Sequence, residues 1–241
     1  MKTLNILVFL LIFNTFVLLG FLVSESKLTG QATYERITVN ITRVIDGDTL
    51  VYEIGNITQH CRLLGINTPE KKNPGYEEAT SYLKQYEGKQ IEVEDRGKDK
   101  YQRTLAYIYF NNKLLNEEIL KLGLATLYVY DKDENYNKLE KAEKQARKNE
   151  AGLWKKSENY GCIKLVELKW KENERCKNQE QLILNNNCRE MNIILKDDAN
   201  HIEKIQLNQG LFVQNFSCVW NDAGDSLFVR DDSGLLLFYR Y

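Results

Sequence analysis

The sequence is poor in proline and histidine, and it has no excess of positive charge. Its 241 residues include two prolines, Pro69 and Pro74, and two histidines, His60 and His201. The prolines lie so close together that they predict one shaped loop. Lysine and arginine total 33 against 34 for aspartate and glutamate, which gives a net charge of -1. This balance excludes a surface that attracts anions everywhere, so an anionic ligand must be attracted locally.

The overall composition fits a folded protein. Hydrophobic residues make up 43% of the chain and charged residues 28%, which is typical of soluble folded proteins rather than disordered ones. The length suits one large domain or two small ones.

One long hydrophobic run lies at the start of the chain. Residues 4–23 are almost entirely apolar, and a helix of about twenty residues spans roughly 30 Å, the thickness of a bilayer core. Lys2 precedes the run and the next basic residue is Lys27, which predicts a cytoplasmic N-terminus. We therefore predict a transmembrane anchor over residues 1–23 and a polar linker over 24–33, with the rest of the chain extracellular.

A cleaved signal peptide is the alternative for this run, and cleavage would make the protein secreted. Signal peptides usually have an apolar core of about 7–15 residues followed by a cleavage site between small residues. The run here is longer, and Phe-Leu-Val at 21–23 is a poor cleavage context, so we favour the anchor. A buried core helix is the third and least favoured interpretation.

The cysteines are concentrated in the C-terminal third of an exported chain. Two disulfides with three possible pairings are predicted, and four buried thiols are the alternative. The spacing lacks the C-x2-C pairs of a zinc site. Cys61 alone precedes the group, which consists of Cys162, Cys176, Cys188 and Cys218.

The segment from 34 to 156 has the pattern of a small barrel with helices. The apolar spacing predicts three helices. The first starts near Asn73 and ends at Gly88, the second ends at Gly123, and the third covers 134–150. In the last helix, Glu140–Lys144 and Glu143–Arg147 predict a solvated face. The order of elements fits an oligonucleotide/oligosaccharide-binding (OB) fold with five strands and three helices. The strands are predicted over 37–44, 49–54, 59–64, 90–94 and 104–110.

After Trp154 the pattern changes to short apolar runs separated by turn clusters, without a helical period. About seven such strands predict an immunoglobulin-like antiparallel β-sandwich over 160–241. The apolar runs lie at 182–184, 193–195, 202–207, 211–216, 226–229 and 235–239.

Four clusters in the first domain have residue types suited to phosphodiester hydrolysis. Arginine forks onto two phosphate oxygens, and fixed positive charge stabilises the transition state. Carboxylate, amide and backbone carbonyl oxygens suit Ca²⁺, and a glutamate can take a proton from water. None of this chemistry needs histidine. The clusters are Asp46-Gly47-Asp48-Thr49, the loop from Arg62 to Glu70, Asp99-Lys100-Tyr101-Gln102-Arg103 and Tyr128-Val129-Tyr130.

Each cluster also has an ordinary structural interpretation when it is taken alone. Asp46 and Asp48 are common turn residues, and Arg62 with Glu70 could form a surface salt bridge worth about 0–1 kcal/mol. Only the four clusters taken together, in this order, favour a catalytic site over these ordinary structural roles.

Together the clusters resemble the staphylococcal nuclease (thermonuclease) family over residues 37–154. The motifs are D-G-D-T, R-L-L-G-I-N-T-P-E, D-K-Y-x-R, Y-V-Y and A-G-L-W. The resemblance implies a monomeric, calcium-dependent endonuclease that cleaves DNA and RNA and leaves 3′-phosphates. It implies catalytic roles for Arg62, Glu70 and Arg103, calcium ligation by Asp48, Asn67 and the Thr68 carbonyl, and substrate contacts from Lys100, Tyr101, Tyr128 and Tyr130.

The sequence departs from the family pattern at two positions. Asn67 stands where the best-known member has aspartate, which removes one negative charge and predicts weaker calcium affinity. Gln102 replaces a glycine. Non-catalytic members of this fold usually lose the arginine–glutamate set, which is intact here.

The C-terminal stretch resembles a lamin-tail domain through softer motifs at 182–186, 195–197, 219–225 and 228–231. We expect it to bind DNA or the cell envelope, and it contains no catalytic constellation. Two alternatives to an active nuclease stay open. One is a barrel that binds single-stranded nucleic acid without cutting, and the other is a cell-surface adhesion protein that acts through the sandwich.

Overall fold

The computed structural model describes residues 34–128, 132–170, 180–198, 201–217, 219–220 and 224–241. The predicted membrane segment at 1–23 and the linker at 24–33 lie outside these residues. Within the described part of the chain, no helix has both the length and the hydropathy needed to cross a bilayer.

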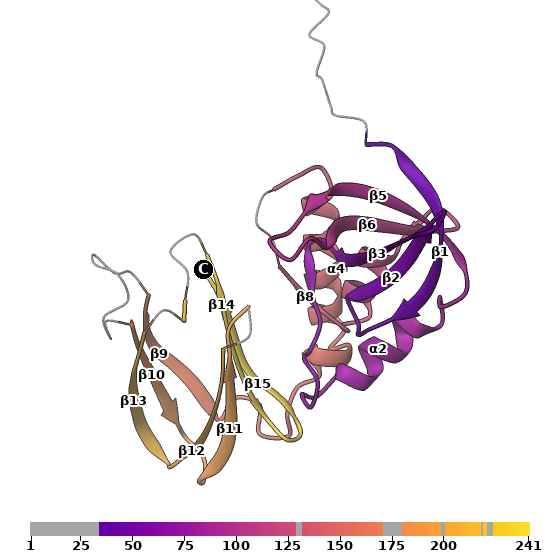
Figure 1. The fold of residues 1–241 in the computed structure, drawn as a ribbon. Coiled ribbons are helices and arrows are strands. Elements are labelled where there is room, and N and C mark those ends of the chain that lie inside the picture. Colours follow the sequence, from indigo (N-terminus) through magenta and orange to yellow (C-terminus); the bar gives the residue numbers. More distant parts are fainter. Residues whose placement is uncertain (1–33, 129–131, 171–179, 199–200, 218, 221–223) are drawn as a thin grey trace, which may run out of the picture. The chain divides into compact units, whose positions relative to one another are not determined.

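Five strands form a closed barrel in the first part of the chain (Figure 1). They follow the order β3-β2-β1-β5-β6, and a parallel pairing of β3 with β6 closes the ring. The predicted five-stranded barrel is therefore confirmed. The strands are β1 (Arg36–Val44), β2 (Thr49–Ile54), β3 (Ile57–Leu63), β5 (Gln90–Lys98) and β6 (Thr104–Phe110).

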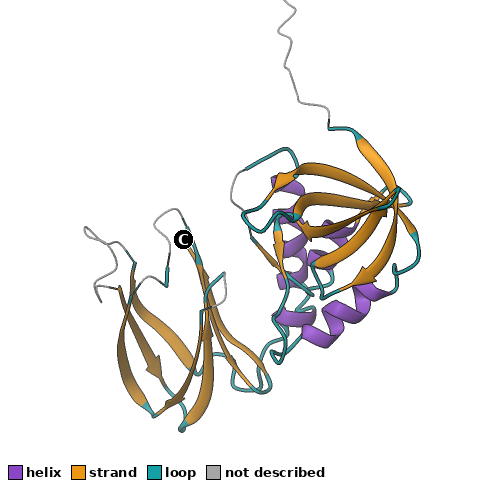
Figure 2. Ribbon diagram, in the orientation of Figure 1, coloured by secondary structure: helices purple, strands orange, loops and turns teal. Residues whose placement is uncertain are grey.

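Apolar side chains from the strands and helices share one core inside this part. Leu50 and Leu63 from neighbouring strands are fully buried, and so is Leu83 from the first helix. The three predicted helices are present and lie beside the barrel strands (Figure 2). They are α2 (Tyr76–Lys84), α3 (Leu115–Lys121) and α4 (Tyr136–Lys148).

The prediction for the polar face of α4 was half right. Glu140 and Lys144 form the expected exposed pair at 2.8 Å. Glu143, however, is fully buried and pairs with Arg240 instead of Arg147. It shares a helix face with Leu139 and lies under the C-terminal part of the chain, so its partner comes from a strand distant in sequence.

Short strands that the sequence did not reveal hold the loop after β3. The two-residue strand β4 (Ile66–Asn67) pairs with β8 (Thr126–Leu127), and β7 (Lys113–Leu114) extends the sheet beside β6. A strand of two residues shows no alternation, so its sequence gives no signal. The β4–β8 pair fixes Asn67 opposite Thr126.

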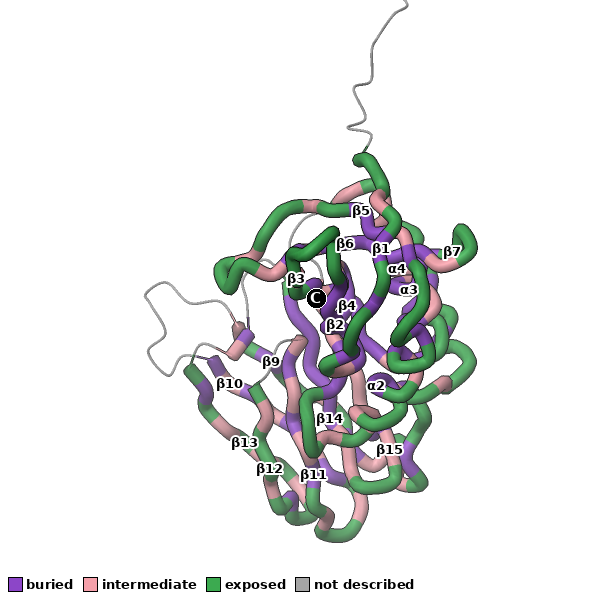
Figure 3. Tube along the Cα trace, turned by 45° about the vertical axis from the view of Figure 1, so that its right-hand side comes forward, coloured by how far each residue is buried: buried purple, intermediate pink, exposed green. Residues whose placement is uncertain are grey.

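Two antiparallel sheets form the C-terminal part and enclose a shared core, as the alternating pattern predicted. One sheet has the order β13-β10-β9 and the other β12-β11-β14-β15. Buried segments run through strands of both the barrel and this sandwich (Figure 3). The strands are β9 (Ile163–Lys169), β10 (Glu180–Asn186), β11 (Met191–Lys196), β12 (Ile202–Leu207), β13 (Gly210–Phe216), β14 (Ser226–Asp231) and β15 (Gly234–Arg240).

The first sandwich strand, β9, was missed by the sequence analysis. Only Ile163 and Leu168 are buried along it, while charged residues occupy positions between them. That pattern is typical of a polar connecting loop and not of a strand. The strand is held because it pairs with β10 along its whole length.

A disulfide joins Cys162 to Cys188 across 26 residues of sequence. Only one of the three predicted pairings includes this bond. Cys176 and Cys218 lie outside the described residues. Cys61 is a buried free thiol in the barrel, and burial raises its pKa to about 12.

The A-G-L-W motif at 151–154 connects the barrel to the sandwich. Gly152 has φ +52°, and a Cβ atom there would lie 2.4 Å from the Gly123 carbonyl oxygen, so only glycine fits. The Trp154 ring is buried against Phe228 and Phe238 of the sandwich, with ring centroids 5.7 and 5.0 Å away. The junction is therefore a packed apolar contact.

Asn116 of α3 provides a test of the barrel's internal polar contacts. Its Oδ1 accepts from the Ile108 amide at 3.0 Å, and its Nδ2 donates to the Leu64 carbonyl at 2.8 Å. Asn116→Ala leaves these buried groups unpaired and should lower the free energy of unfolding by about 2 kcal/mol. Urea denaturation measures this loss. Asn137→Ala on the exposed face of α4 is the control and should change stability little; equal losses would contradict the assignment.

Candidate active site

A cleft of about 710 Å³ opens on the barrel surface beside the loop that follows β3. It collects residues from all of the predicted clusters. Of the ten predicted site residues, Thr68 lines a neighbouring pocket instead of this cleft, and Tyr130 lies outside the described residues. The others line the cleft: Asp48, Arg62, Asn67, Glu70, Lys100, Tyr101, Arg103 and Tyr128.

Asp48 is a buried carboxylate that the neighbouring loop orients. Its Oδ2 accepts hydrogen bonds from the Thr68 backbone amide at 2.8 Å and from the Thr68 hydroxyl at 2.9 Å. Gly47 makes this close approach possible, because a Cβ atom there would lie 2.6 Å from the Cβ of Ala79 in α2. The D-G-D-T turn is thus packed directly against the loop that carries Thr68.

Asp46 is a second carboxylate of the cleft, which the sequence analysis treated as a turn residue. Its Oδ1 accepts from the Asp48 amide at 3.1 Å. Burial and then the nearby charge of Asp48 raise the pKa of Asp46. Two neighbouring carboxylates therefore lie in the cleft beside Arg62. The repeated aspartate in D-G-D was the available signal.

Arg62 on β3 joins two of the predicted metal ligands. Its Nη2 lies 3.2 Å from Asp48 Oδ2 and 3.1 Å from Asn67 Oδ1. These two oxygens therefore face the same positive charge.

Arg103 also lines the cleft and is held there by Asp99. Its Nε donates to Asp99 Oδ2 at 2.8 Å, while Asp99 Oδ1 accepts from the amides of Tyr101 and Arg103. Although desolvation opposes it, this set of hydrogen bonds lowers the pKa of Asp99. The D-K-Y-x-R loop is thus built around Asp99, which the sequence analysis did not assign to the site.

Gln102 in this loop has φ +65°, in the left-handed region that favours glycine. A glycine at this position would adopt the turn conformation without strain. Gln102 adopts the same conformation at a cost of about 1 kcal/mol.

Two aromatic residues border the cleft. Tyr101 is 68% exposed, with the Lys100 Nζ 5.0 Å and the Arg103 Cζ 5.5 Å from its ring centroid. Tyr128 follows β8, and its amide donates to the Gly65 carbonyl at 3.0 Å. An exposed ring flanked by cations can stack on a base while the cations face phosphate.

Glu70 is exposed where the loop leaves Pro69. Its carbonyl accepts from the Asn73 amide at 3.0 Å, which makes a turn immediately after it. Within the described part of the chain, no hydrogen bond or ion pair engages its side chain. Its carboxylate is thus available to water and to ligands in the cleft.

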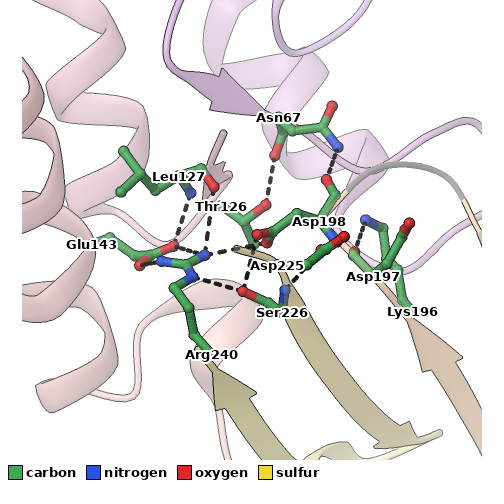
Figure 4. Close-up of polar contacts among 10 residues, drawn as sticks. All are labelled: Asn67, Thr126, Leu127, Glu143, Lys196, Asp197, Asp198, Asp225, Ser226 and Arg240. Carbon is green, nitrogen blue, oxygen red and sulfur yellow. Dashed lines mark hydrogen bonds and ion pairs between the residues drawn. The ribbon is translucent and has the colours of Figure 1, made fainter. Parts of the chain in front are cut away.

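A loop of the sandwich also reaches this site (Figure 4). Asn67 Nδ2 donates to the Asp198 carbonyl at 3.0 Å. The Asp198 carboxylate lies 3.2 Å from Arg240 Nη2, and burial raises its pKa to about 6 against the opposing effect of Arg240. Arg240 also pairs with Glu143 of α4. The sequence carries no local signal for these contacts, because they join residues distant in the chain.

The oxygen atoms near Arg62 fit a hard cation. The predicted set combines the Asp48 carboxylate, the Asn67 amide oxygen and the Thr68 carbonyl, all suited to Ca²⁺. Asp48 and Asn67 already direct oxygens at one positive group. Within the described ranges, this cleft included, no group of three or more histidine, cysteine, aspartate or glutamate residues could hold a metal ion, so the predicted set depends on amide and carbonyl oxygens beside one carboxylate.

Comparison with known proteins places this arrangement among nucleases. Residues 60–156 match the family model described as staphylococcal nuclease homologue. The thermonuclease of Staphylococcus hyicus is 33% identical over 138 residues, which is 53% of this chain and 82% of the relative. The thermonuclease of Staphylococcus intermedius is 32% identical over 126 residues, covering 48% and 75%. An endonuclease of Bacillus subtilis (strain 168) is 34% identical over 157 residues, covering 56% and 74%.

The buried pair between Arg240 and Glu143 provides a test of the contact between barrel and sandwich. Arg240→Met removes the partner of a fully buried carboxylate and should destabilise the protein by about 3 kcal/mol. Adding Glu143→Gln should restore much of that loss, because the neutral amide no longer needs a counter-charge. Urea denaturation of both variants measures the effect. Lys144→Met breaks the exposed pair with Glu140 and should cost under about 0.5 kcal/mol; a similar loss there would refute the distinction.

Proposed function

The chain belongs to the staphylococcal nuclease family, and from this premise we propose that it is an active, calcium-dependent endonuclease. It hydrolyses phosphodiester bonds of DNA and RNA and leaves 3′-phosphates. One observation carries this proposal. Arg62, Glu70 and Arg103 line the same cleft beside the Asp48 carboxylate.

The two arginines bind and neutralise the reacting phosphate. Arg62 comes from β3 and Arg103 from the loop before β6, so their guanidinium groups approach the cleft from different elements. Each can donate two hydrogen bonds to phosphate oxygens, and the negative charge on those oxygens grows in the transition state. Asp99 holds Arg103 before substrate binds, which reduces the reorganisation required.

Glu70 acts on the attacking water. Its exposed side chain has no competing partner within the described part of the chain, so it can accept the proton as water attacks phosphorus. The 5′ oxygen is the leaving group, and the product keeps phosphate on the 3′ side.

Asp48, Asn67 and the Thr68 carbonyl would hold the calcium ion. When bound, calcium polarises the phosphoryl group and orients water. Thr68 contributes twice, because its amide and hydroxyl also orient the Asp48 carboxylate. Asp46 adds negative charge behind Asp48 and partly offsets the charge that asparagine lacks at position 67.

Lys100, Tyr101, Tyr128 and Tyr130 form the substrate-binding part of the proposal. Stacking on tyrosine tolerates any base, which suits a nuclease with little sequence preference. Tyr130 is included in this proposed substrate site only because of the family resemblance.

We also propose that the enzyme works outside the cytoplasm as a monomer anchored by residues 4–23. The Cys162–Cys188 disulfide supports export, because disulfides persist in oxidising compartments. The sandwich over 160–241 is proposed to be a lamin-tail-like domain that binds DNA or the cell envelope.

Cleavage assays on the full chain in mild detergent test the enzyme. Wild type should cut single- and double-stranded DNA and RNA with calcium and not with a chelator. Arg62→Ala and Glu70→Ala should each lower kcat by about a hundredfold to ten-thousandfold, because each removes a group used in the transition state.

The matched controls are Arg43→Ala and Glu53→Ala, two exposed residues of the barrel outside the cleft. Both should retain wild-type kcat. A wild-type chain that binds nucleic acid but never cuts it, even at tens of millimolar calcium, would show that the barrel is a binding module.

Tyr101 is tested by its effect on substrate affinity. Tyr101→Ala removes a stacking platform worth about 1–3 kcal/mol, so KM should rise about tenfold with kcat little changed. Tyr160→Ala removes another exposed tyrosine, outside the cleft, and should leave KM unchanged. A normal KM in Tyr101→Ala would exclude stacking on this ring.

A further inference from the structure

The Asn67 side chain has a defined orientation because its partners on the two sides differ. On one side the Asp198 carbonyl lies 3.0 Å from Nδ2. A carbonyl oxygen only accepts, so the amide nitrogen must face it. The amide oxygen then faces Arg62 Nη2, a donor, at 3.1 Å. Both contacts select the same orientation, with Oδ1 turned toward Asp48 and the cleft.

The Asp198 carbonyl is held firmly within the sandwich. The Asp198 amide donates to Asp225 Oδ1 at 3.0 Å, and its Oδ2 accepts from the Ser226 hydroxyl at 3.0 Å. Asp225 and Ser226 are both buried at the start of β14. A residue bonded through its backbone and its side chain presents its carbonyl in one direction.

The same residue is also tied back to the barrel (Figure 4). Asp198 Oδ1 lies 3.2 Å from Arg240 Nη2, and Arg240 pairs with Glu143 of α4. Glu143 Oε1 accepts from the Leu127 amide at 2.8 Å. Leu127 belongs to β8, which pairs with β4 and therefore with Asn67 itself. The contacts close a ring that begins and ends at Asn67.

This ring explains why asparagine is suitable at position 67. An aspartate there would place a carboxylate oxygen at hydrogen-bond distance from the Asp198 carbonyl, with no proton between them. That repulsion would turn the side chain or separate the loop. Asparagine supplies the donor that the carbonyl needs and keeps one oxygen for the cleft.

We propose that the sandwich completes the calcium site: Asp198 is a positioning residue that holds the Asn67 amide with Oδ1 directed at the ion. The barrel alone then lacks part of its binding site, and a fixed amide oxygen replaces part of what the missing carboxylate would contribute. This inference rests on the proposed function, because it assumes that calcium occupies the site next to Asp48.

Calcium affinity, measured by titration calorimetry without nucleic acid, provides the test. The full chain is compared with Asp198→Ala, Asn67→Ala and the double variant. Asp198→Ala keeps the backbone carbonyl but removes the side-chain bonds to Ser226 and Arg240 that hold it in place, so calcium binding should weaken about tenfold, the lower range for disturbing a group that orients a metal ligand. In the Asn67→Ala background the same change should have no further effect, because Asp198 acts only through Asn67.

Asp198→Asn separates positioning from charge. Asparagine has nearly the same shape as aspartate and keeps an acceptor for Arg240, but it carries no charge. If Asp198 works by positioning, Asp198→Asn should keep calcium affinity within about threefold of wild type while Asp198→Ala loses tenfold. Equal losses in the two variants would show that the charge alone matters and would overturn the proposal.

The Asn67 side-chain amide gives a second readout that needs no calcium. In wild type its NMR signal should report one slowly exchanging, hydrogen-bonded amide, and in Asp198→Ala, where the carbonyl is no longer held by the side chain, the amide should exchange faster and shift toward the signal of an unconstrained asparagine. If Asp198→Ala does not fold, Ser226→Ala removes one hydrogen bond to Asp198 and should shift affinity and signal less, in the same direction. Unchanged signals in these variants would also overturn the proposal.

The proposed function and the positioning role of Asp198 predict different results for wild type and Asp198→Ala. If wild type binds no calcium at tens of millimolar, the proposed function fails, and the positioning role in ion binding fails with it. If wild type binds calcium and cuts nucleic acid, but Asp198→Ala leaves the calcium Kd unchanged or weakens it equally in the Asn67→Ala background, only the positioning role fails.

Discussion

The parallel pairing of β3 with β6 determines where the cleft lies. It sets Cys61 opposite Thr104 and Arg62 opposite Leu105, so Arg62 lies close to Arg103, which precedes β6. The antiparallel pairing of β2 with β3 sets Thr49 opposite Arg62 and brings the D-G-D-T turn to the same place. Closing the barrel therefore gathers two arginines and a buried carboxylate from three separate stretches of sequence. The buried apolar core inside the barrel stabilises that closure.

The sequence was informative wherever a residue's role depends on its local pattern. Strand alternation and helical spacing predicted the barrel strands and the three helices, and eight of the ten residues that the motifs singled out line one cleft. Local pattern failed where the role depends on a distant partner. Glu143 looked like an exposed charge because its counter-ion, Arg240, lies in the last strand. Asp99 belonged to one of the motifs but received no role, because its hydrogen bonds to Tyr101 and Arg103 form only in the folded turn.

The two departures from the family pattern have different physical meanings. Gln102 occupies a left-handed position, so its cost is local strain in a turn whose hydrogen bonds still form. Nothing in its surroundings explains the preference for glutamine. Asn67 occupies a position defined by its neighbours: an arginine on one side and a carbonyl on the other. An amide satisfies both and a carboxylate satisfies only one. The first departure is a tolerated loss, whereas the second matches a contact that the sandwich adds.

The ion pair between Arg240 and Glu143, which joins the sandwich to the barrel, is better suited to specifying how the two parts pack than to stabilising their packing. Burying Glu143 and most of Arg240 removes their hydration, which offsets much of the attraction between them. An apolar patch of equal area could hold the two parts together but would allow sliding. Buried charged groups that each need an ion-pair partner allow few relative positions of the two parts. The same set of bonds holds the Asp198 carbonyl in place. As the proposed calcium ligand, Asn67 requires that kind of placement, because its orientation depends on a hydrogen bond of 3.0 Å that a small slide of the sandwich would break.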